Sequence, residues 1–181
     1  MFDLNIKTDR LTLRPFRLVE APRVRALADN VEIARMVASI PHPYPDGLAE
    51  KWIGMHSERR ASGKGYPFAI ALEGEVVGSI GIEDGGDGAF ELGYWLGQDY
   101  WGRGFVSEAA AALVTFAFGW LSRSHLRARF ISDNLASGRI LARLGFTSAG
   151  PQQPIFHKVR GENVELTPLI LTRDVWAAKQ V

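Results

Sequence analysis

One stretch carries the strongest structural signal in this sequence: Glu91-Leu-Gly-Tyr-Trp-Leu-Gly-Gln-Asp-Tyr-Trp-Gly-Arg-Gly-Phe-Val-Ser-Glu108, followed by an alanine-rich run to Leu121. Residues 91–96 have the aromatic and aliphatic content of a strand, residues 97–104 that of a loop, and the run from Val106 favours a helix. A helix start carries unpaired N–H groups and a partial charge of about +0.5, so glycines there let a phosphate approach several donors. We therefore expect Gly102 to Ser107 to bind an anion. The alternative is a tight turn without a ligand.

Two common nucleotide-binding patterns do not fit this loop. A P-loop needs Gly-x-x-x-x-Gly-Lys-Ser/Thr, and the loop has no Lys-Ser/Thr pair. A dinucleotide fingerprint needs a third small residue of the Gly type and an acidic residue about 20 positions further on. Ser107 replaces that glycine, and Arg127 and Arg129 occupy the region of the acidic residue. The loop alone therefore does not identify its anion.

Length and composition predict one ordinary domain. The 181 residues, 46% of them hydrophobic, suffice for a single core, so we expect one domain over residues 1–181. The 21 basic and 20 acidic residues give a formal net charge of +1, without the basic stripe of a nucleic-acid-binding protein. We therefore expect no nucleic-acid partner.

Cysteine usage and the N-terminal sequence bear on compartment and chemistry. The sequence has no cysteine, which excludes disulfides, thiolate metal sites and an acyl group carried on a thiol. The N-terminus lacks the apolar core of a signal peptide, and no run approaches the about 20 apolar residues that span a bilayer. We expect a cytoplasmic protein without a membrane partner.

The N-terminal third predicts one strand and several short helices. Residues 11–17 alternate apolar and polar side chains around a proline, which favours an edge strand. Residues 19–37 have helical spacing that is interrupted near their middle, which predicts two short helices before a proline-rich loop. Asp46 is expected to cap a helix over residues 46–61, within which Trp52 is assigned to the core rather than to a ligand site.

The remaining chain predicts a mixed sheet. A compact turn at residues 73–75 joins two antiparallel strands, and Gly85 to Gly88 lead into the central strand. A helix over residues 134–146, closed by Gly145, follows a later strand. The further strands are expected at residues 66–72, 76–82, 91–96, 126–131, 146–149, 156–159 and 164–172.

These elements fix a fold class. The helix between residues 96 and 126 makes the strands at 91–96 and 126–131 a parallel pair, whereas the strands before them are antiparallel. Such a sheet can splay at the parallel pair and leave a ligand-binding crevice at the carboxyl ends of its strands. We predict an α/β (α+β) fold with a mostly antiparallel twisted sheet of about six to seven strands, a splayed parallel central pair and flanking helices.

Ordered motifs along nearly the whole chain resemble one family. Trp101-Gly-Arg-Gly-Phe105 follows the central strand, and Asn134-x-x-Ser137 precedes Leu144-Gly-Phe146. Thr8-Asp-Arg-Leu-Thr-Leu-Arg-Pro-Phe16 stands near the start and Leu171-Thr-Arg-Asp-Val-Trp176 near the end. This ordered set is similar to the GCN5-related N-acetyltransferase (GNAT) family, in particular its branch of ribosomal-protein N-terminal (RimJ/RimL-like) acetyltransferases. The resemblance implies a GNAT-like fold and acetyl transfer from acetyl-CoA to an amine.

The resemblance also implies which residues hold acetyl-CoA. Its pyrophosphate is expected on the N–H groups of residues 103–107, and the backbone of Trp95 and Leu96 is expected to pair with the pantetheine arm. Asn134 matches an asparagine that hydrogen-bonds this arm, and the same residue could cap a helix. The expected cofactor-binding residues are Trp95, Leu96, Trp101, Gly102, Arg103, Gly104, Phe105, Val106, Ser107 and Asn134.

Direct transfer from a thioester to an amine needs a base for the amine proton and a donor for the developing oxyanion. A backbone N–H of Trp95 or Leu96 is the expected oxyanion donor. Glu91 is the candidate base, acting through a water, and its alternative role is that of a structural carboxylate. Ser137 is the candidate catalytic group at the leaving thiolate, and its alternative role is a bond within the first helical turn.

The sequence departs from the family pattern at two positions. Several relatives carry a tyrosine as general acid where this chain has Leu141, and many carry Gln or Arg where it has Asp99. Arg143 could reach a ribose phosphate or could be a solvated helix-face arginine. The four histidines show no metal-ligand spacing, so we expect no metal, and we assign a structural role to His157; they are His42, His56, His125 and His157.

The acceptor stays open at this point. The resemblance favours a protein or peptide N-terminal amine, and the alternative is a small amine such as a polyamine, an antibiotic or an amino-acid derivative. A net-acidic pocket would favour a polyamine, and an open groove with backbone donors would favour a peptide. The missing tyrosine leaves a non-catalytic acyl-CoA-binding module as a further alternative. A homodimer is expected only by analogy with the family.

Overall fold

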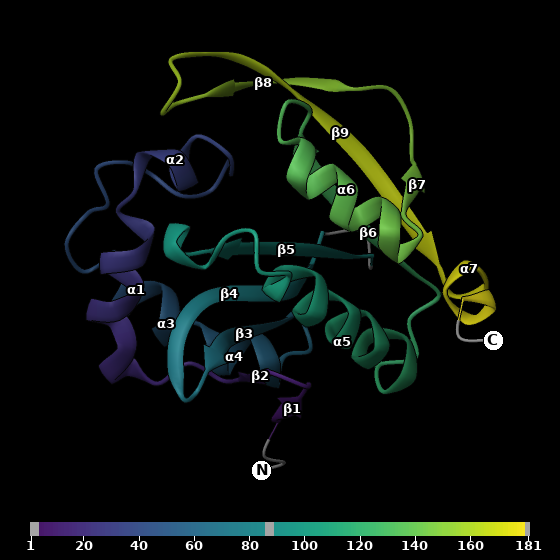
Figure 1. The fold of residues 1–181 in the computed structure, drawn as a ribbon, viewed down its shortest axis with the longest axis horizontal. Coiled ribbons are helices and arrows are strands. Elements are labelled where there is room, and N and C mark those ends of the chain that lie inside the picture. Colours follow the sequence, from purple (N-terminus) through teal and green to yellow (C-terminus); the bar gives the residue numbers. More distant parts are fainter. Residues whose placement is uncertain (1–3, 86–88, 180–181) are drawn as a thin grey trace.

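The computed structural model describes residues 4–85 and 89–179, and its described strands form one sheet (Figure 1). Nine strands follow the order β1-β2-β3-β4-β5-β6-β9-β7, with β8 paired to β9. All neighbouring strands are antiparallel except β5 and β6. The strands are β1 Ile6–Lys7, β2 Leu11–Arg14, β3 Gly65–Leu72, β4 Glu75–Asp84, β5 Phe90–Leu96, β6 His125–Ile131, β7 Thr147–Ser148, β8 Gln153–His157 and β9 Glu162–Thr172.

Helices cover both faces of this sheet. Helix α5 packs against β2, β4 and β5 on one face, whereas α1 packs on β4 and α4 on β3. The predicted pair of short helices over residues 19–37 is confirmed by α1 and α2. The helices are α1 Ala21–Ala28, α2 Val31–Ala34, α3 Leu48–Gly54, α4 His56–Ala61, α5 Phe105–Gly119, α6 Leu135–Leu144 and α7 Arg173–Ala178, with short 3-10 turns at Leu18–Glu20 and Gln98–Tyr100.

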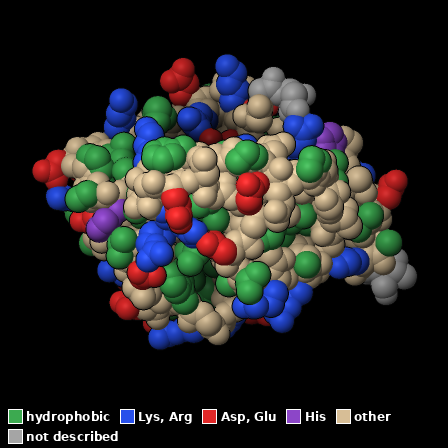
Figure 2. Space-filling model, turned by 90° about the horizontal axis from the view of Figure 1, so that it is seen from above, with side chains coloured by type: hydrophobic (Ala, Val, Ile, Leu, Met, Phe, Trp, Pro, Cys, Tyr) green, Lys and Arg blue, Asp and Glu red, His purple; other side chains and the backbone are tan. Residues whose placement is uncertain are grey.

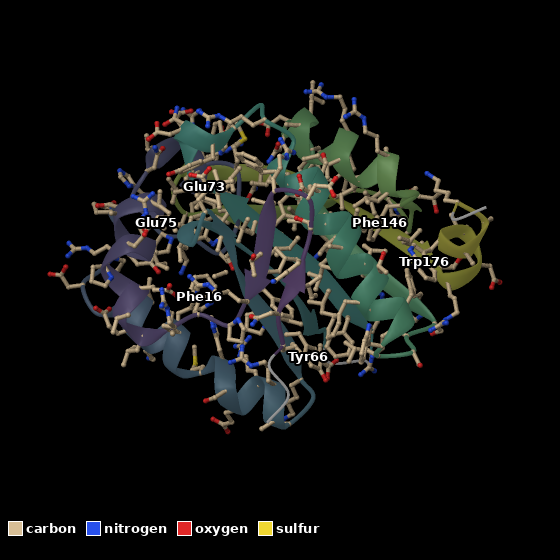
Figure 3. The ribbon with its side chains drawn as sticks, turned by 60° about the horizontal axis from the view of Figure 1, so that its bottom comes forward. Phe16, Tyr66, Glu73, Glu75, Phe146 and Trp176 are labelled. Carbon is tan, nitrogen blue, oxygen red and sulfur yellow. The ribbon has the colours of Figure 1, made fainter. Side chains whose placement is uncertain are left out.

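The two faces bury separate hydrophobic clusters because strand side chains alternate between them. Phe68 and Ile70 of β3 lie in the cluster under α5, whereas Ala69 between them lies in the opposite cluster. Phe16 belongs to this second cluster, and Figure 3 shows it well apart from Phe146 and Trp176, which pack in the first. The sheet is therefore buried on both sides at its centre.

The central parallel pair splays as predicted. Only three positions of β5 and β6 are paired: Phe90 with Leu126, Glu91 with Arg127 and Leu92 with Ala128. Beyond them β5 continues to Leu96 and β6 to Ile131 without a ladder between them. The mostly antiparallel fold with a splayed parallel pair is thus confirmed. Its described strands number nine rather than about six to seven, and the two-residue strand β1 is the one for which the sequence predicts no strand.

Three predictions in the N-terminal region are wrong. Strand β2 is not an edge strand, since β1 pairs with its outer side. Asp46 does not cap the next helix: the N-cap is Gly47, with φ of +73°, and the Asp46 carboxylate pairs with Arg25 at 2.6 Å. The expected continuous helix is also divided, because α3 ends and α4 begins around Met55.

The remaining elements lie close to their predicted positions, except for β8, which spans Gln153–His157 instead of the predicted 156–159. The β3–β4 turn contains Glu73 and Gly74, both with positive φ, as a tight hairpin turn requires. Part of the predicted 85–88 link lies outside the described residues. Basic and acidic side chains are interspersed on the face in Figure 2, consistent with the formal net charge of +1. Among the described helices, none combines the length and apolar character needed to cross a membrane.

Candidate active site

The predicted anion-binding loop lies at the start of α5, where the splayed strand β5 ends. Gly102 and Gly104 have φ of +76° and +79°, a conformation that favours glycine. Gly104 is the N-cap of α5 and offers no side-chain cap. The hydrogen bond from Glu108 N to Gly104 O is 3.1 Å long, so the N–H groups of residues 105–107 precede the intrahelical ladder. These donors need partners from outside the helix, as an anion site requires.

Two residues from the N-terminal motif brace this loop from behind. Arg10 Nε donates to Glu108 Oε2 at 2.7 Å, and Arg10 Nη1 donates to the carbonyl oxygen of Arg103 at 2.9 Å. Thr8 Oγ1 donates to Glu108 Oε1 at 2.5 Å. Burial by itself would raise the pKa of Glu108. The hydrogen bonds from Thr8 and Arg10 outweigh burial and hold this pKa below its usual value. The Thr8-Asp-Arg motif therefore fixes the loop from about 100 residues away, as the separation of Thr8 and Glu108 shows.

A cavity of about 570 Å³, here called the loop cavity, opens beside this loop. It extends from the end of β5 to one side of α6, where Ser137, Arg139 and Arg143 line it. Arg103 is the one expected cofactor-binding residue that is not among its lining residues. The expected residues that do line it are Trp95, Leu96, Trp101, Gly102, Gly104, Phe105, Val106, Ser107 and Asn134.

The register of β5 distinguishes the two predicted backbone donors. Gly97 N donates to Val77 O at 2.8 Å, and hydrogen-bonded positions alternate along an antiparallel pair. Trp95, which is opposite Ser79, is therefore the next such position, and its N–H points into the sheet. The N–H of Leu96 points instead toward the splayed side, where the Trp101 indole donates to Leu96 O at 2.8 Å. Leu96 is the better candidate donor.

Three polar side chains meet where α6 begins. Asn134 is the N-cap of α6, and its Oδ1 accepts from Ser137 N at 3.1 Å, which confirms the capping role. The Ser137 hydroxyl lies 2.7 Å from the Tyr94 hydroxyl and does not close the first helical turn. Burial raises the pKa of Tyr94 to about 12, although the bond to Ser137 opposes the rise. Tyr94 therefore keeps its proton at every physiological pH.

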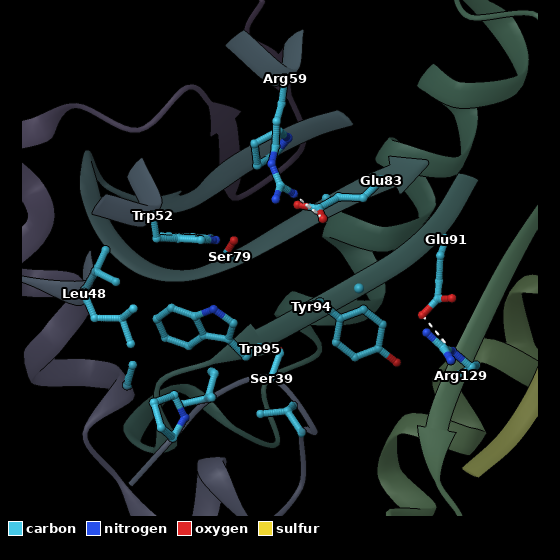
Figure 4. Close-up of a pocket in the computed structure, with 18 of the residues that line it drawn as sticks. Ser39, Leu48, Trp52, Arg59, Ser79, Glu83, Glu91, Tyr94, Trp95 and Arg129 are labelled. Carbon is cyan, nitrogen blue, oxygen red and sulfur yellow. Dashed lines mark hydrogen bonds and ion pairs between the residues drawn. The ribbon is translucent and has the colours of Figure 1, made fainter. Parts of the chain in front are cut away.

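A second cavity of about 470 Å³, here called the aromatic cavity, lies on the α1 and α3 side of the sheet (Figure 4). Glu91 lies in its wall and is paired with Arg129 at 3.0 Å. Glu83, which is opposite Glu91 in the β4–β5 register, is paired with Arg59 at 2.5 Å. Both carboxylates thus have a guanidinium partner, and neither is an isolated negative charge.

The two cavities meet at β5. Val37, Tyr94 and Trp95 line both of them. Neighbouring strand residues face opposite sides of a sheet, so Tyr94 and Trp95 can each reach a different cavity at this junction. The splay between β5 and β6 removes the strand that would otherwise fill this edge. The loop cavity and the aromatic cavity are therefore adjacent at Tyr94, where β5 has no ladder with β6.

Arg160 and His157 from the C-terminal half bind residues 35–37, the segment beside this junction. Arg160, in the β8–β9 turn, binds both carboxylate oxygens of Asp133 at 2.5 and 3.0 Å and the carbonyl of Arg35 at 2.8 Å. The bond to Asp133 raises the pKa of Arg160. His157 Nε2 lies 3.3 Å from Val37 O, which supports the predicted structural role of this buried histidine. Residues 35–37 are thereby fixed to the β8–β9 hairpin.

His56 is buried behind the aromatic cavity without a hydrogen bond. Its ring centroid lies 4.4 Å from that of Trp52 and 5.5 Å from that of Phe16. Neither ring nitrogen has a partner among the described residues. Burial, with a smaller contribution from Arg60 and Arg59, lowers the pKa of His56 to about 4. The folded protein therefore holds this imidazole neutral.

We expect this histidine to make the fold acid-sensitive. Between pH 6.5 and about 4 the unfolded chain binds a proton at His56 that the folded chain does not, so the free energy of unfolding falls as pH falls. The loss should be on the order of 2 kcal/mol, complete near pH 4. Urea unfolding of wild type and His56→Leu at pH 7.5 and 4.5 measures it. The pH-dependent loss should shrink in His56→Leu and persist in the control His125→Leu; an equal loss in all three proteins contradicts it.

Several other predicted residues lie away from both cavities. Leu141 is fully buried in the core under α5, and Asp99 is exposed outside both cavity linings. Arg143 is exposed and lines the loop cavity, which is compatible with both of its alternatives. In the described part of the chain, no three His, Asp or Glu side chains group as metal ligands do.

Sequence reasoning missed Tyr94 and Arg10 as site residues. Tyr94 stands within the central motif, but only its contact with Ser137, 43 positions later, reveals its location at the junction. Arg10 stands within the N-terminal motif, and its contact with the loop depends on a pairing 93 positions away. Trp52 was assigned to the core; it packs on Phe16 and also lines the aromatic cavity.

Comparison with known proteins identifies the family. A model of the "Acetyltransferase (GNAT) domain" matches residues 10–147. The chain belongs to the GNAT acetyltransferases. The match covers the splayed strand, the glycine loop and α6, so the GNAT signature includes the elements that form the loop cavity. The chain is accordingly an N-acetyltransferase of the GNAT family.

The GNAT assignment agrees with individual relatives. The chain is 28% identical to "Uncharacterized N-acetyltransferase p20" of Bacillus licheniformis over 94% of this chain and 97% of that protein. It is 29% identical to the "[Ribosomal protein uS5]-alanine N-acetyltransferase" of Escherichia coli, covering 81% and 80% of the two chains. Its fold matches "RimL- Ribosomal L7/L12 alpha-N-protein acetyltransferase in complex with Coenzyme A" with a TM-score of 0.82, 18% identity and coverage of 94% and 99%.

Proposed function

We propose that this protein transfers an acetyl group from acetyl-CoA directly to a primary amine, and that the amine is the N-terminus of a protein or peptide. The observation that carries the proposal is the junction of two cavities at Tyr94, Trp95 and Val37. Direct transfer requires two substrates to enter from different sides and to meet at one point. The relatives that act on ribosomal proteins support a peptide acceptor, and the CoA complex of a fold neighbour supports the donor.

Acetyl-CoA would lie in the loop cavity. The N–H groups of residues 105–107 offer donors to its pyrophosphate, and Arg139 and Arg143 line the same cavity with positive charge. The backbone edge of β5 at Leu96 would bind the pantetheine amides, since this edge has no neighbouring strand. The N–H of Leu96 would also be placed to stabilise the oxyanion.

The acceptor amine would approach from the aromatic cavity and must be neutral when it attacks. The C–N bond forms, the C–S bond breaks, one amine proton leaves and one proton reaches the sulfur. Glu91 would take the amine proton through a water. The Tyr94–Ser137 pair, with its hydroxyl oxygens 2.7 Å apart, would supply the proton to the sulfur. Tyr94 would thus be the general acid, in place of the tyrosine that several relatives carry at the position of Leu141.

Two alternatives have less support. A polyamine acceptor would need free carboxylates, whereas Glu83 and Glu91 are each paired with an arginine. A non-catalytic CoA-binding module was suggested by the missing tyrosine, and the contact between Tyr94 and Ser137 supports a different source for the proton. Both alternatives stay open to measurement.

The test measures CoA release from acetyl-CoA with a panel of short peptides and small amines. We expect release with peptides that have a free N-terminus and none with N-terminally blocked peptides. Glu91→Gln should lower kcat by about 10- to 100-fold, because it removes the base, while Glu165→Gln on the exposed face of β9 should leave kcat within about twofold. Binding of acetyl-CoA without release on any acceptor would support the non-catalytic module instead.

A further inference from the structure

The aromatic cavity is larger than a small N-terminal residue requires. Its volume of about 470 Å³ lies in the range of about 300–1,000 Å³ that is typical of pockets for whole small molecules. The methyl group of an N-terminal alanine would occupy about as much space as one water, whose share of liquid volume is about 30 Å³. Most of this cavity would remain empty or wet with such an acceptor.

The cavity also has two chemically different ends (Figure 4). Leu48, Trp52 and Trp95 lie together toward one end, and the Glu91–Arg129 pair lies at the other, with Tyr94 between them. An amine that reaches Tyr94 therefore has an apolar, aromatic wall on one side and guanidinium groups on the other.

The aromatic wall is held in place before any ligand arrives. The Trp52 ring meets Phe16 at 5.0 Å and 66° and His56 at 4.4 Å and 85°, both edge-on contacts. Trp95 is fixed by the β4–β5 ladder opposite Ser79. Trp52 and Trp95 both line the aromatic cavity, so a flat group inside it can lie against an indole ring. A preformed wall loses little conformational entropy on binding.

We infer that the preferred acceptor is a primary α-amine next to a large apolar side chain, above all an aromatic one. This inference rests on the proposed function and names its substrate class. The side chain lies against Trp52 and Leu48, the amine lies at Tyr94, and the carbonyl that follows the α-carbon faces the guanidinium groups of Arg59 and Arg129. Those groups keep N–H donors beyond the ones that bind Glu83 and Glu91. Both a free amino-acid amide and a peptide N-terminus present this chemistry.

The experiment compares peptides of the form X-Ala-Ala-Ala, with X as Ala, Ser, Leu, Phe or Trp, in the CoA-release assay. We expect kcat/KM to be at least about tenfold higher for X as Phe or Trp than for Ala or Ser, the gain available from burying a large apolar side chain. Phenylalanine amide, tested alongside, distinguishes the two sources: comparable activity indicates a small-molecule acceptor, and much lower activity indicates a peptide. Equal or higher kcat/KM for Ala or Ser overturns the inference and leaves the proposed function intact.

Failure of the proposed function has a different signature. If CoA is released with none of the peptides or amides, the proposed acetyl transfer to an α-amine is wrong, and so is the inferred side-chain preference. Turnover confined to spermidine, included in the panel, would likewise overturn both, because it would assign the cavity to a polyamine. These outcomes are distinct from turnover with the wrong side-chain preference.

Variants of the apolar end test where the preference arises. Trp52→Ala should reduce the advantage of Phe over Ala, measured as the ratio of their kcat/KM values, by about tenfold. Trp120→Ala is the matched control, since Trp120 is 84% exposed and lies outside the cavity. Leu48→Arg, at the half-buried first residue of α3, provides a second test if Trp52→Ala is unstable. An unchanged Phe preference in both cavity variants would overturn the assignment of the side chain to this end.

Discussion

Gly104→Glu is expected to abolish acetyl-CoA binding. The residue caps α5 with φ of +79° and lines the loop cavity, so a glutamate there puts both bulk and negative charge beside the N–H groups of residues 105–107. Each charge-assisted hydrogen bond to a phosphate contributes about 1.5–3 kcal/mol, so the loss of two weakens binding by at least about 100-fold. Isothermal titration of acetyl-CoA into each protein measures the effect.

Gly74→Glu is the matched control for backbone strain and added charge. Gly74 also has positive φ, at +89°, and it lies in the exposed β3–β4 turn with open space around its Cα. This variant should bind acetyl-CoA with affinity within about twofold of wild type, although it carries the same conformational cost of roughly 1 kcal/mol. Wild-type affinity in Gly104→Glu would mean that the glycine loop is only a turn.

The sequence predicted the elements whose signals are local. Asn134 and Gly145 cap the two ends of α6, as the sequence predicts, because a cap depends on residues within one turn of it. The central strand, loop and helix follow from a similarly short window. The predicted cap at Asp46 is wrong because it depends on a distant contact. The Asp46 carboxylate pairs with Arg25 on another helix, and Gly47, in the left-handed conformation, is the N-cap.

The site itself depends on contacts that no local window contains. The bracing of the loop joins Thr8 and Arg10 to Glu108 across about 100 positions. The bond that fixes residues 35–37 joins Arg160 to Arg35 across 125 positions. The sequence motifs contained several of these residues but not their partners. Motif spacing therefore predicts which residue types are present, whereas the loop cavity arises only when the splayed strand, the glycine loop and α6 are brought together.

The proposed general acid illustrates this dependence, since the sequence has Leu141 where several relatives carry a tyrosine. A tyrosine at that position would arise from α6, one turn after Ser137, but here the side chain is fully buried under α5. The hydroxyl reaches the same serine from the sheet instead, through Tyr94 on β5. A phenol can thus be supplied to one point by two different elements, and only the pairing in space reveals which of them does so.

Tyr94→Phe is accordingly expected to lower kcat by about 100-fold with little change in the KM for acetyl-CoA, because it removes a proton donor and keeps the ring. Ser137→Ala should lower kcat by about tenfold, and the double variant should be no slower than Tyr94→Phe if the two hydroxyls act as a unit. Steady-state CoA release at saturating substrates measures all three.

The pH profile supplies an independent readout of the same role. An acid must be protonated to act, so a donor with a pKa of about 12 keeps its activity as pH rises through 9 and 10 and loses it only near 12. Wild type should therefore show no alkaline decline from this group below pH 10. Tyr66→Phe, at a half-buried tyrosine whose ring packs on Phe90 and Phe116, is the matched control and should retain wild-type kcat. If Tyr94→Phe also retains wild-type kcat, the sulfur is protonated by another group or by water, and the 2.7 Å contact between Tyr94 and Ser137 only positions α6 against the splayed strand.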